Sequence, residues 1–424
     1  MIKFLLKGIF RDRSRSLFPF LTVAVGVMLT VFLYCYIKGA ESNFIESSAR
    51  FSTGHVKVMS RAYAAEADQN PNELAYIGVK SLLGELRQEF PEMIWTPRIR
   101  FGGLLDIPDE TGETRSQGPV AGLAVDLFGS ESPERLILDI EKAVQSGNPP
   151  RKPGEILVSA DLASTLDVRP GDTATLISST MNGSLAMANF TVAGTIRFGV
   201  TAMDRGAVLA DLRDIQEALD MEDAAGEILG FDQDFIYRDR DAEDMAGRFN
   251  ALREAEGGEF LPVMVTLKSQ SGLADLLAMM GMFSSVVVVI FVAAMSIVLW
   301  NAGLMGSLRR YGEIGVRLAM GEDKAHLYRS LIAESMLIAI FGTIAGTAVG
   351  VAIAYYIQVH GIDISSLMKS SSLMITDVLR AQVTPLSFVI GFMPGLGATF
   401  IGTSISGIGI YRRKTSTLMK ELEA

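Results

Sequence analysis

The stretch Leu17–Ile37 reads LFPFLTVAVGVMLTVFLYCYI, and it decides the class of this protein. It contains no Asp, Glu, Lys or Arg, and about 20 consecutive apolar residues suffice for a helix to cross the hydrocarbon core of a bilayer. Three further apolar runs lie in the last third of the chain, at Leu276–Trp300, Leu331–Ile357 and Ser387–Ile410. We therefore predict an α-helical membrane protein with four transmembrane helices.

A large, water-exposed domain is predicted between the first and the second of these helices. Residues 44–270 contain 37 Asp and Glu against 21 Lys and Arg, a net charge of −16, whereas the whole chain of 424 residues has a net charge of −10. This acidic balance argues against nucleic acid as a partner, because phosphate backbones are bound by basic surfaces. The domain reads as mixed α/β, with a strand–helix–strand unit at Pro153–Ile177 and a hairpin turn at Asn182-Gly183.

Basic residues gather in the N-terminal segment, in the loop between the second and third apolar runs, and in the C-terminal tail. Short basic segments flanking transmembrane helices stay on the cytoplasmic side, and four spans bring all three of these segments to one side. We therefore predict that both termini are cytoplasmic. The first apolar run is too long for the h-region of a signal peptide, so we interpret it as a retained helix.

The predicted organisation follows from these spans. Its segments are a cytoplasmic amphipathic segment (1–16), the first transmembrane helix (17–37), a periplasmic α/β domain (38–275) with stalk-like ends near Lys38–Arg50 and Pro262–Asp275, the second transmembrane helix (276–300), a cytoplasmic loop containing a short helix (301–330), the third transmembrane helix (331–357), a periplasmic loop (358–386), the fourth transmembrane helix (387–410) and a cytoplasmic tail (411–424).

The sequence shows no catalytic constellation, and we predict that the chain is not an enzyme. His55 is the only histidine of the acidic domain, and Cys35, inside the first apolar run, is the only cysteine of the chain. Neither a Cys/His metal spacing nor the phosphate-binding pattern GxxxxGK[ST] occurs. We therefore predict no catalytic residue, no metal ligand, no cofactor in this chain and no disulfide within it.

Rows of small residues in the third and fourth spans indicate close helix packing. Gly342, Gly346 and Gly350 are spaced four residues apart, and Gly391 and Gly395 repeat the spacing. Such rows let helix backbones approach closely inside lipid, either within one chain or between subunits. Pro394 is expected to kink the fourth span.

The cytoplasmic loop carries the most specific pattern. Glu313-Ile314-Gly315 is followed by Arg317-Leu318-Ala319-Met320-Gly321, then by Glu334 and by the glycine row of the third span. This order resembles the signature of the FtsX/MacB-type ABC transporter permeases. In the acidic domain, Gly54-His55-Val56, Gly154–Leu176 and Phe190–Gly194 resemble the lipoprotein-releasing permeases of the LolC/LolE type within that family.

The resemblance implies that this chain is the permease subunit of a transporter of the bacterial inner membrane. ATP and Mg would then be bound by a separate cytoplasmic ABC ATPase subunit, and a second permease copy or paralogue would complete a dimer. The resemblance places ATPase coupling in the loop helix, at Arg310, Glu313, Ile314, Arg317, Leu318 and Gly321.

The implied activity is the extraction of lipoproteins or another amphiphile from the membrane by ATP-driven motion of the periplasmic domain. A periplasmic carrier is a further possible partner, although the hairpin near Ser178–Asn189 is short and lacks proline. Two alternatives stay open at this point. One is a regulatory permease that transmits motion to a periplasmic protein, and the other is an efflux permease of the MacB type.

The predicted topology can be tested by cysteine labelling in intact cells. A cysteine at Gly183, in the acidic domain, should react with a membrane-impermeant maleimide added outside. A cysteine at Ser416, in the C-terminal tail, should react only after the membrane is opened, because the basic tail is expected in the cytoplasm. The reverse labelling pattern would overturn the topology.

Overall fold

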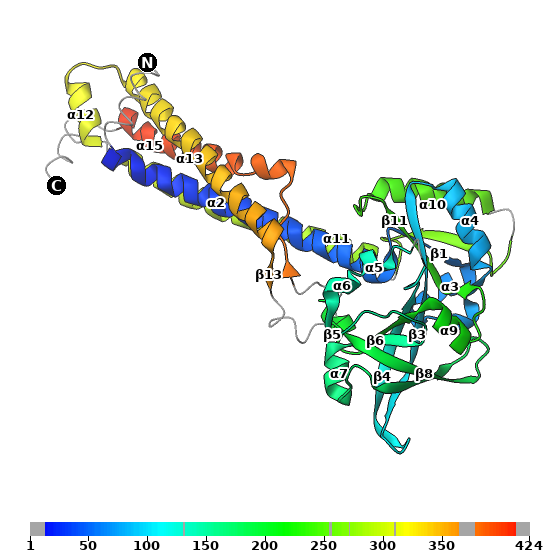
Figure 1. Ribbon diagram of the computed structural model, residues 1–424. Coiled ribbons are helices and arrows are strands. Elements are labelled where there is room, and N and C mark those ends of the chain that lie inside the picture. Colours follow the sequence, from blue (N-terminus) through cyan, green and yellow to red (C-terminus); the bar gives the residue numbers. More distant parts are fainter. Residues whose placement is uncertain are drawn as a thin grey trace. The chain divides into compact units, whose positions relative to one another are not determined.

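The computed structural model describes residues 13–129, 132–253, 257–270, 272–308, 311–363 and 378–412 (Figure 1). The contacts between residues divide the chain into two units. The helical unit comprises the described parts of Met1–Ser42, Met279–Ile362 and Leu379–Ala424, and the sheet unit comprises the described parts of Asn43–Ala278 and Asp363–Val378. Each unit is described separately below.

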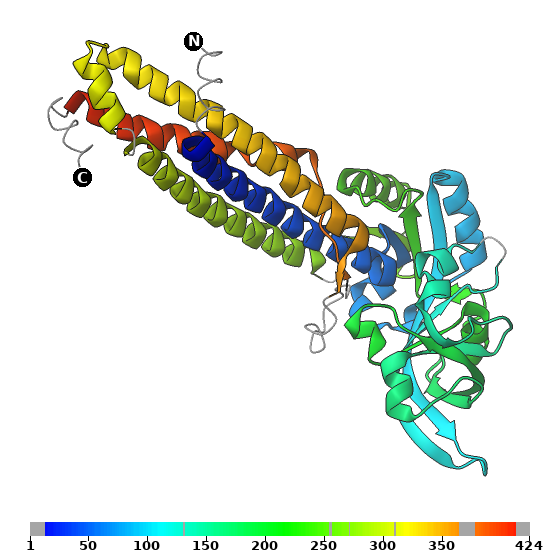
Figure 2. The same cartoon turned by 60° about the vertical axis from the view of Figure 1, so that its left-hand side comes forward.

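Within the described chain, four helical segments are long and apolar enough to cross a membrane. The first three are α2 (Arg13–Ser48), α11 (Leu273–Leu308) and α13 (Lys324–His360). The fourth is built from a 3-10 turn η4 (Pro385–Phe388), a π-helix η5 (Met393–Ala398) and α15 (Thr399–Arg412). Both views of the helical unit show these segments side by side (Figure 2). Four apolar helices together with a large mixed sheet fit the predicted membrane protein.

Helix α2 contacts the glycine row of α13 backbone to backbone. A Cβ atom added to Gly346 would lie 2.3 Å from the carbonyl oxygen of Ala24, and one added to Gly350 would lie 2.9 Å from that of Met28. At Gly342 the nearest atom would be Cβ of Val23, at 2.9 Å. These glycines therefore face a helix of the same chain, and no larger side chain fits without a shift of the backbone.

The fourth span leaves regular α-helical geometry around its proline. Pro394 lies in the π-helix η5, and prolines and π-turns are common causes of helix kinks. Cβ atoms added to Gly391 and Gly395 would lie 2.6 Å from Cγ1 of Val27 and 2.2 Å from Oγ1 of Thr343. Gly391 and Gly395 therefore also face α2 and α13.

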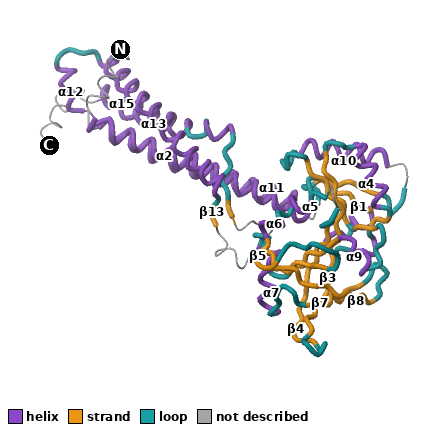
Figure 3. The backbone as a smooth tube through the Cα atoms, in the orientation of Figure 1, coloured by secondary structure: helices purple, strands orange, loops and turns teal. Residues whose placement is uncertain are grey.

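The sheet unit is built on one mixed sheet (Figure 3). Its strand order is β12-β1-β11-β3-β4-β9-β6-β8-β5, and β7 pairs with both β3 and β8. The bounds are β1 Val56–Ser60, β3 Met93–Pro108, β4 Thr114–Val125, β5 Val144–Gly147, β6 Glu155–Ser159, β7 Thr173–Ser179, β8 Leu185–Ile196, β9 Ala207–Asp211, β11 Glu227–Asp232 and β12 Pro262–Thr266. Because β7 joins β8 back to β3, six of the strands form a closed ring, whereas β11, β1 and β12 extend one side of it.

Short helices and further strands complete the sheet unit. They are η1 (Ala49–Thr53), α3 (Arg61–Ala65), η2 (Ala67–Gln69), η3 (Asn72–Leu74), β2 (Tyr76–Ile77), α4 (Val79–Glu89), α5 (Glu134–Ile137), α6 (Ile140–Ala143), α7 (Ala160–Leu166), α8 (Thr201–Asp204), α9 (Leu212–Ala218), β10 (Ala224–Ala225) and α10 (Asp239–Arg253). The remaining elements are α12 (Tyr311–Ala319), β13 (Ile362–Asp363) and β14 (Val378–Leu379). A continuous cluster of buried apolar side chains, which includes Phe90, Ile99 and Phe249, forms a core of the sheet unit.

Several elements lie where the sequence predicts them. The predicted unit at Pro153–Ile177 corresponds to β6, α7 and β7, and Asn182-Gly183 lies in the turn between β7 and β8, where Gly183 has φ +79°. The expected second stalk differs from the structure. Residues Pro262–Thr266 form β12, which is paired with β1, and the helix begins only at Leu273. The alternation of apolar residues around Met264 favours a strand there, because every second side chain reaches the core.

The backbone contact at Gly346 leads to a test of helix packing. We expect Gly346→Ala to lower the free energy of unfolding of the full chain in detergent by about 1–3 kcal/mol, because the added methyl group forces two packed helices apart. The matched control is Gly281→Ala in α11, where an added Cβ would meet no atom within 4 Å. Denaturant titration of both variants is the measurement. Equal stability of the two variants would contradict the packing described here.

Candidate functional site

The loop helix α12 is attached to α13 through an apolar contact. Ile314 is buried against Leu327 and Leu331 of α13, and Leu318 packs against the same cluster. Ile314 and Leu318 are four residues apart on α12, and Leu327 and Leu331 are four apart on α13, so each pair lies on one face of its helix. Among the described side chains of α12 and its C-terminal end, the large apolar ones that are exposed are Val316 and Met320.

Gly321 ends α12 in a Schellman motif. Its φ is +90°, its amide donates to the carbonyl oxygen of Leu318, and the amide of Glu322 donates to that of Arg317. Helix α13 then begins at once, with the carboxylate of Asp323 accepting a hydrogen bond from the amide of His326. The two helices are therefore joined by a short turn that these hydrogen bonds hold.

These contacts divide the residues predicted for ATPase coupling into groups. Ile314 and Leu318 face α13, and Gly321 forms the turn. Arg317 is partly exposed, whereas Arg310 lies outside the described residues and only the position of Glu313 in α12 is described. Helical periodicity identified the helix, but it could not tell which apolar face meets the rest of the chain.

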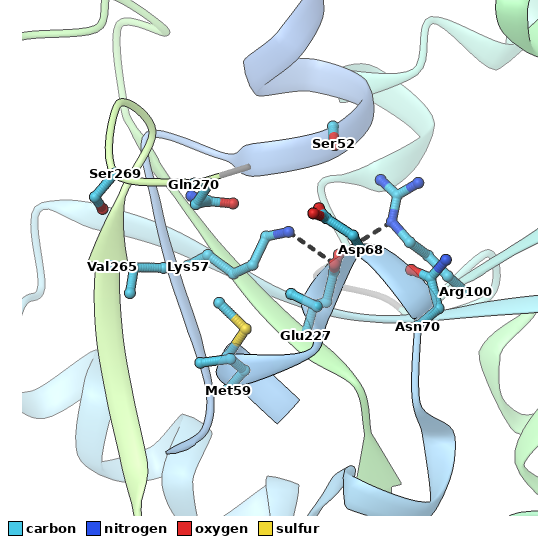
Figure 4. Close-up of a pocket in the computed structure, with 12 residues that line it drawn as sticks. Ser52, Lys57, Met59, Asp68, Asn70, Arg100, Glu227, Val265, Ser269 and Gln270 are labelled. Atoms are coloured by element: carbon cyan, nitrogen blue, oxygen red, sulfur yellow. Dashed lines mark hydrogen bonds and ion pairs between the residues drawn. The ribbon is translucent and has the colours of Figure 1, made fainter. Parts of the chain in front are cut away.

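A second set of polar residues, which the sequence did not reveal, lies across three neighbouring strands of the sheet unit (Figure 4). Glu227 of β11 is almost completely buried, and it accepts hydrogen bonds from Nζ of Lys57 in β1 at 2.7 Å and from Nε of Arg100 in β3 at 3.3 Å. Burial alone would raise the pKa of Glu227, but the charges of Lys57 and Arg100 hold it below its usual value. The carboxylate is therefore ionised and balances two cations.

A further buried ion pair lies beside this set and joins β3 to α5. Arg98 and Glu134 are both fully buried, and two parallel hydrogen bonds join them at 2.7 and 2.8 Å. The hydroxyl of Thr96 donates to the same carboxylate at 2.8 Å. Such a forked contact fixes the direction of the guanidinium group.

The two arginines bind the end of the first long helix. After Ser48, α2 continues as the π-helix η1, and the last carbonyl groups of a helix lack partners inside it. Nη1 of Arg98 donates to the carbonyl oxygen of Arg50 at 2.8 Å, and Nη2 of Arg100 donates to that of Phe51. We call Lys57, Arg98, Arg100, Glu134 and Glu227 the helix-end cluster, because they cap this helix end with paired charges.

A polar cavity of about 230 Å³ adjoins the helix-end cluster. Figure 4 shows Lys57, Arg100 and Glu227 in it together with Asp68, Asn70 and Gln270. Nε2 of Gln270 donates to the carbonyl oxygens of Thr53, at the end of η1, and Thr266, at the end of β12. The cavity therefore lies where the chain enters the sheet from α2 and leaves it toward α11.

The described polar side chains of this site are engaged in contacts within the protein. His55, the histidine considered in the sequence, accepts a hydrogen bond at Nδ1 from the amide of Asp232, and burial lowers its pKa to about 4. Among the described residues, no group of three or more His, Cys, Asp and Glu is placed to hold a metal ion. The charged groups of the helix-end cluster instead pair with one another and donate hydrogen bonds to backbone carbonyl oxygens.

Glu227→Gln is expected to destabilise the full chain by about 3–5 kcal/mol, because Lys57 and Arg100 lose their buried counter-ion. The matched control is Glu141→Gln, which removes an exposed partner of Arg135 and should cost less than about 1 kcal/mol. Urea titration of both variants in detergent gives the comparison. A cost at Glu227 no larger than that at Glu141 would show that the cluster does not hold the helix end.

Comparisons with known proteins bear on the helical unit most directly. Residues 285–415, which include α12 and the glycine row, match the model of the FtsX-like permease C-terminal family. The lipoprotein-releasing system transmembrane protein LolC of Xylella fastidiosa strain 9a5c is 26% identical over 214 residues, 49% of this chain and 50% of the relative. LolC of strain Temecula1 / ATCC 700964 gives the same values. The chain thus matches about half the length of these curated relatives.

Among solved structures, the periplasmic region of MacB from Actinobacillus actinomycetemcomitans matches with a TM-score of 0.35 and 8% identity, over 51% of this chain and 91% of that one. This similarity is too low to assign the fold of the sheet unit. The family match covers α12, α13 and the fourth span, and the signature that begins at Glu313 lies inside it. Residues 285–415 therefore match the C-terminal domain of FtsX-like permeases, and about half of the chain is similar to LolC.

Proposed function

We propose that this chain converts ATP binding and hydrolysis in a separate cytoplasmic subunit into motion of its sheet unit, and that this motion extracts lipoproteins or another amphiphile from the inner membrane. In this proposal the sheet unit is periplasmic and both termini are cytoplasmic. The observation that carries the proposal is the attachment of α12 to α13 within the FtsX-like domain.

The attachment supports α12 as the element that receives force from an ATPase. Val316 and Met320 are exposed and free to enter a partner's groove, whereas Ile314 is held against α13. A displacement of α12 would move the start of α13 with it, because an apolar contact and a hydrogen-bonded turn join the two. We assign docking to the exposed residues, and to Ile314 and Leu318 the transmission of the displacement.

The helical unit offers a route from α13 to α2. Packed interfaces shift between discrete arrangements more readily than they deform, so close backbone contact at Gly346 and Gly350 couples the two helices. Helix α2 then continues without a break beyond the apolar run to Ser48. Its end is held by the helix-end cluster, so a movement of α2 would be passed to strand β3 of the sheet.

The energetics make ATP a reasonable source for this work. Removing a lipid anchor from a bilayer costs roughly 0.8 kcal/mol per buried CH₂ group. Nucleotide can supply this only if ATP binds two states of the complex with different affinity. If ATP binds the two states with different affinity, a series of packed helices that links the ATPase to the sheet unit would pass this energy on as movement.

A second permease copy or paralogue is part of the proposal. Helix α11 is the least buried of the four spans, and its exposed side chains include Met282, Phe283, Val289 and Ile290. An apolar helix face of this kind meets lipid or another helix. Two such faces would give a dimer an apolar interior suited to acyl chains.

Substitutions in α12 separate docking from transmission. With the chain and its ATPase subunit reconstituted in nanodiscs, we expect Met320→Asp to weaken binding of the ATPase at least about tenfold, a change of roughly 1.4 kcal/mol. Leu318→Asp should leave binding within a few-fold but abolish ATP-dependent release of substrate, because it opens the contact with α13. Leu185→Asp, at an exposed leucine of β8, is the control. Normal binding and release in both α12 variants would refute the proposed role.

A further inference from the structure

The sheet unit contains a second cavity, which is apolar and measures about 300 Å³. An apolar cavity of about 150 Å³ in a protein core is large enough to bind benzene, so this one has room for a longer hydrocarbon. The side chains that line it are Glu46, Ala49, Arg50, His55, Leu136, Ile137, Phe231 and Phe235.

Two apolar residues at this cavity are held in unfavourable positions. Leu136 of α5 is 72% exposed, although it borders an apolar space. Phe235 has φ +57°, a left-handed conformation that bulky residues rarely adopt, and its ring packs on that of Phe231 with centroids 6.1 Å apart. Strain of this kind is retained mainly at functional sites, and here it places an aromatic ring beside the cavity.

The polar groups of the lining favour a neutral, acyl-type ligand. Nδ1 of His55 accepts the amide hydrogen of Asp232, so in the neutral ring Nε2 carries the proton and can donate to a carbonyl group. The lowered pKa of His55 keeps the ring neutral at pH 7. Arg50 and Glu46 form an ion pair at 3.6 Å, so the charges among the lining residues balance.

The cavity is lined by residues of α2, η1 and α5, and the helix-end cluster links η1 to α5. Glu46, Ala49 and Arg50 come from the end of α2 and from η1, and Leu136 and Ile137 come from α5. Arg98 binds both the carbonyl oxygen of Arg50 and the carboxylate of Glu134, the first residue of α5. A ligand in the cavity would therefore contact the helix end whose motion the proposed function requires.

We infer that this cavity binds one acyl chain of a membrane amphiphile. The bilayer is the source that the chain itself indicates, because Glu46 follows the apolar run Leu17–Ile37 by nine residues on the same helix. The apolar walls take the hydrocarbon, and His55 is the donor for its carbonyl group. The inference rests on the proposed function for the nature of the cargo, and it adds a binding place for that cargo in the sheet unit.

Photo-crosslinking of the full chain tests the inference. The chain is purified into nanodiscs without an ATPase and incubated with palmitic acid that carries a diazirine near the chain end and an alkyne for enrichment. After irradiation, labelled peptides are identified by mass spectrometry. We expect peptides containing Ile137, Phe231 or Phe235 to be labelled at least fivefold more than those containing Leu185 and Met187, which are exposed apolar residues of β8.

A matched pair of variants checks that the label reports the cavity. Leu136→Glu places a charge beside the cavity and should reduce labelling of these peptides at least fivefold. Leu252→Glu, at a leucine of α10 that is 69% exposed and lies outside the lining, should leave labelling unchanged. Both leucines are exposed, so neither change should prevent folding.

Two outcomes would overturn the inference. One is labelling of the cavity peptides no stronger than that of the β8 peptides, which would also be the result if an apolar side chain of a partner protein were the occupant. The other is equal labelling in Leu136→Glu and the unmodified chain. Since no ATPase is present, either failure leaves the coupling through α12 intact. If the cavity peptides are labelled but a separate assay shows that the chain binds no ATPase subunit, the acyl-chain site stands and the proposed function is refuted.

Discussion

The sheet unit depends on two arginines, Arg98 fully buried and Arg100 partly buried, that hold the end of a long helix. Arg98 and Arg100 reach from one strand to the carbonyl groups of Arg50 and Phe51, which the π-helical turn leaves without partners. Guanidinium groups can be buried there only because Glu134 and Glu227 neutralise them. The same contacts hold Arg100 at the wall of the polar cavity and Arg50 at the wall of the apolar cavity. If this capping failed, the end of α2 would lose these two directional contacts with β3.

The helices of the helical unit are held together by a different kind of contact, because lipid provides little hydrophobic driving force for helix association. Close backbone approach at the glycine row supplies dispersion contacts between α13 and α2 instead. Helix α12 is attached to α13 by ordinary burial of Ile314. The two kinds of contact form a continuous series from the exposed face of α12 to α2. The proposed function needs such a series, because α12 lies far along the chain from the sheet unit.

Much of this architecture could be predicted from local patterns. The apolar runs indicated the four long helices, Asn182-Gly183 indicated a hairpin, and the spacing around Gly346 indicated close packing. The helix-end cluster could not be predicted, because Arg98 and Arg100 alternate with Ile99 as exposed residues of a half-buried strand do. Their burial depends on carboxylates 36 and 127 residues away along the chain. Likewise, periodicity showed that α12 is amphipathic, but only the contact with Leu327 and Leu331 shows that Ile314 faces inward.

The central claim is that an ATP-driven partner acts on this permease through α12. The most direct measurement is to purify the full chain from its native membrane in a mild detergent and to identify and quantify the proteins that accompany it by mass spectrometry. The account predicts an ATP-binding subunit in stoichiometric amount, together with acylated proteins, and loss of that subunit from a chain carrying Met320→Asp. Purification of the intact chain without any ATP-binding subunit would contradict the account.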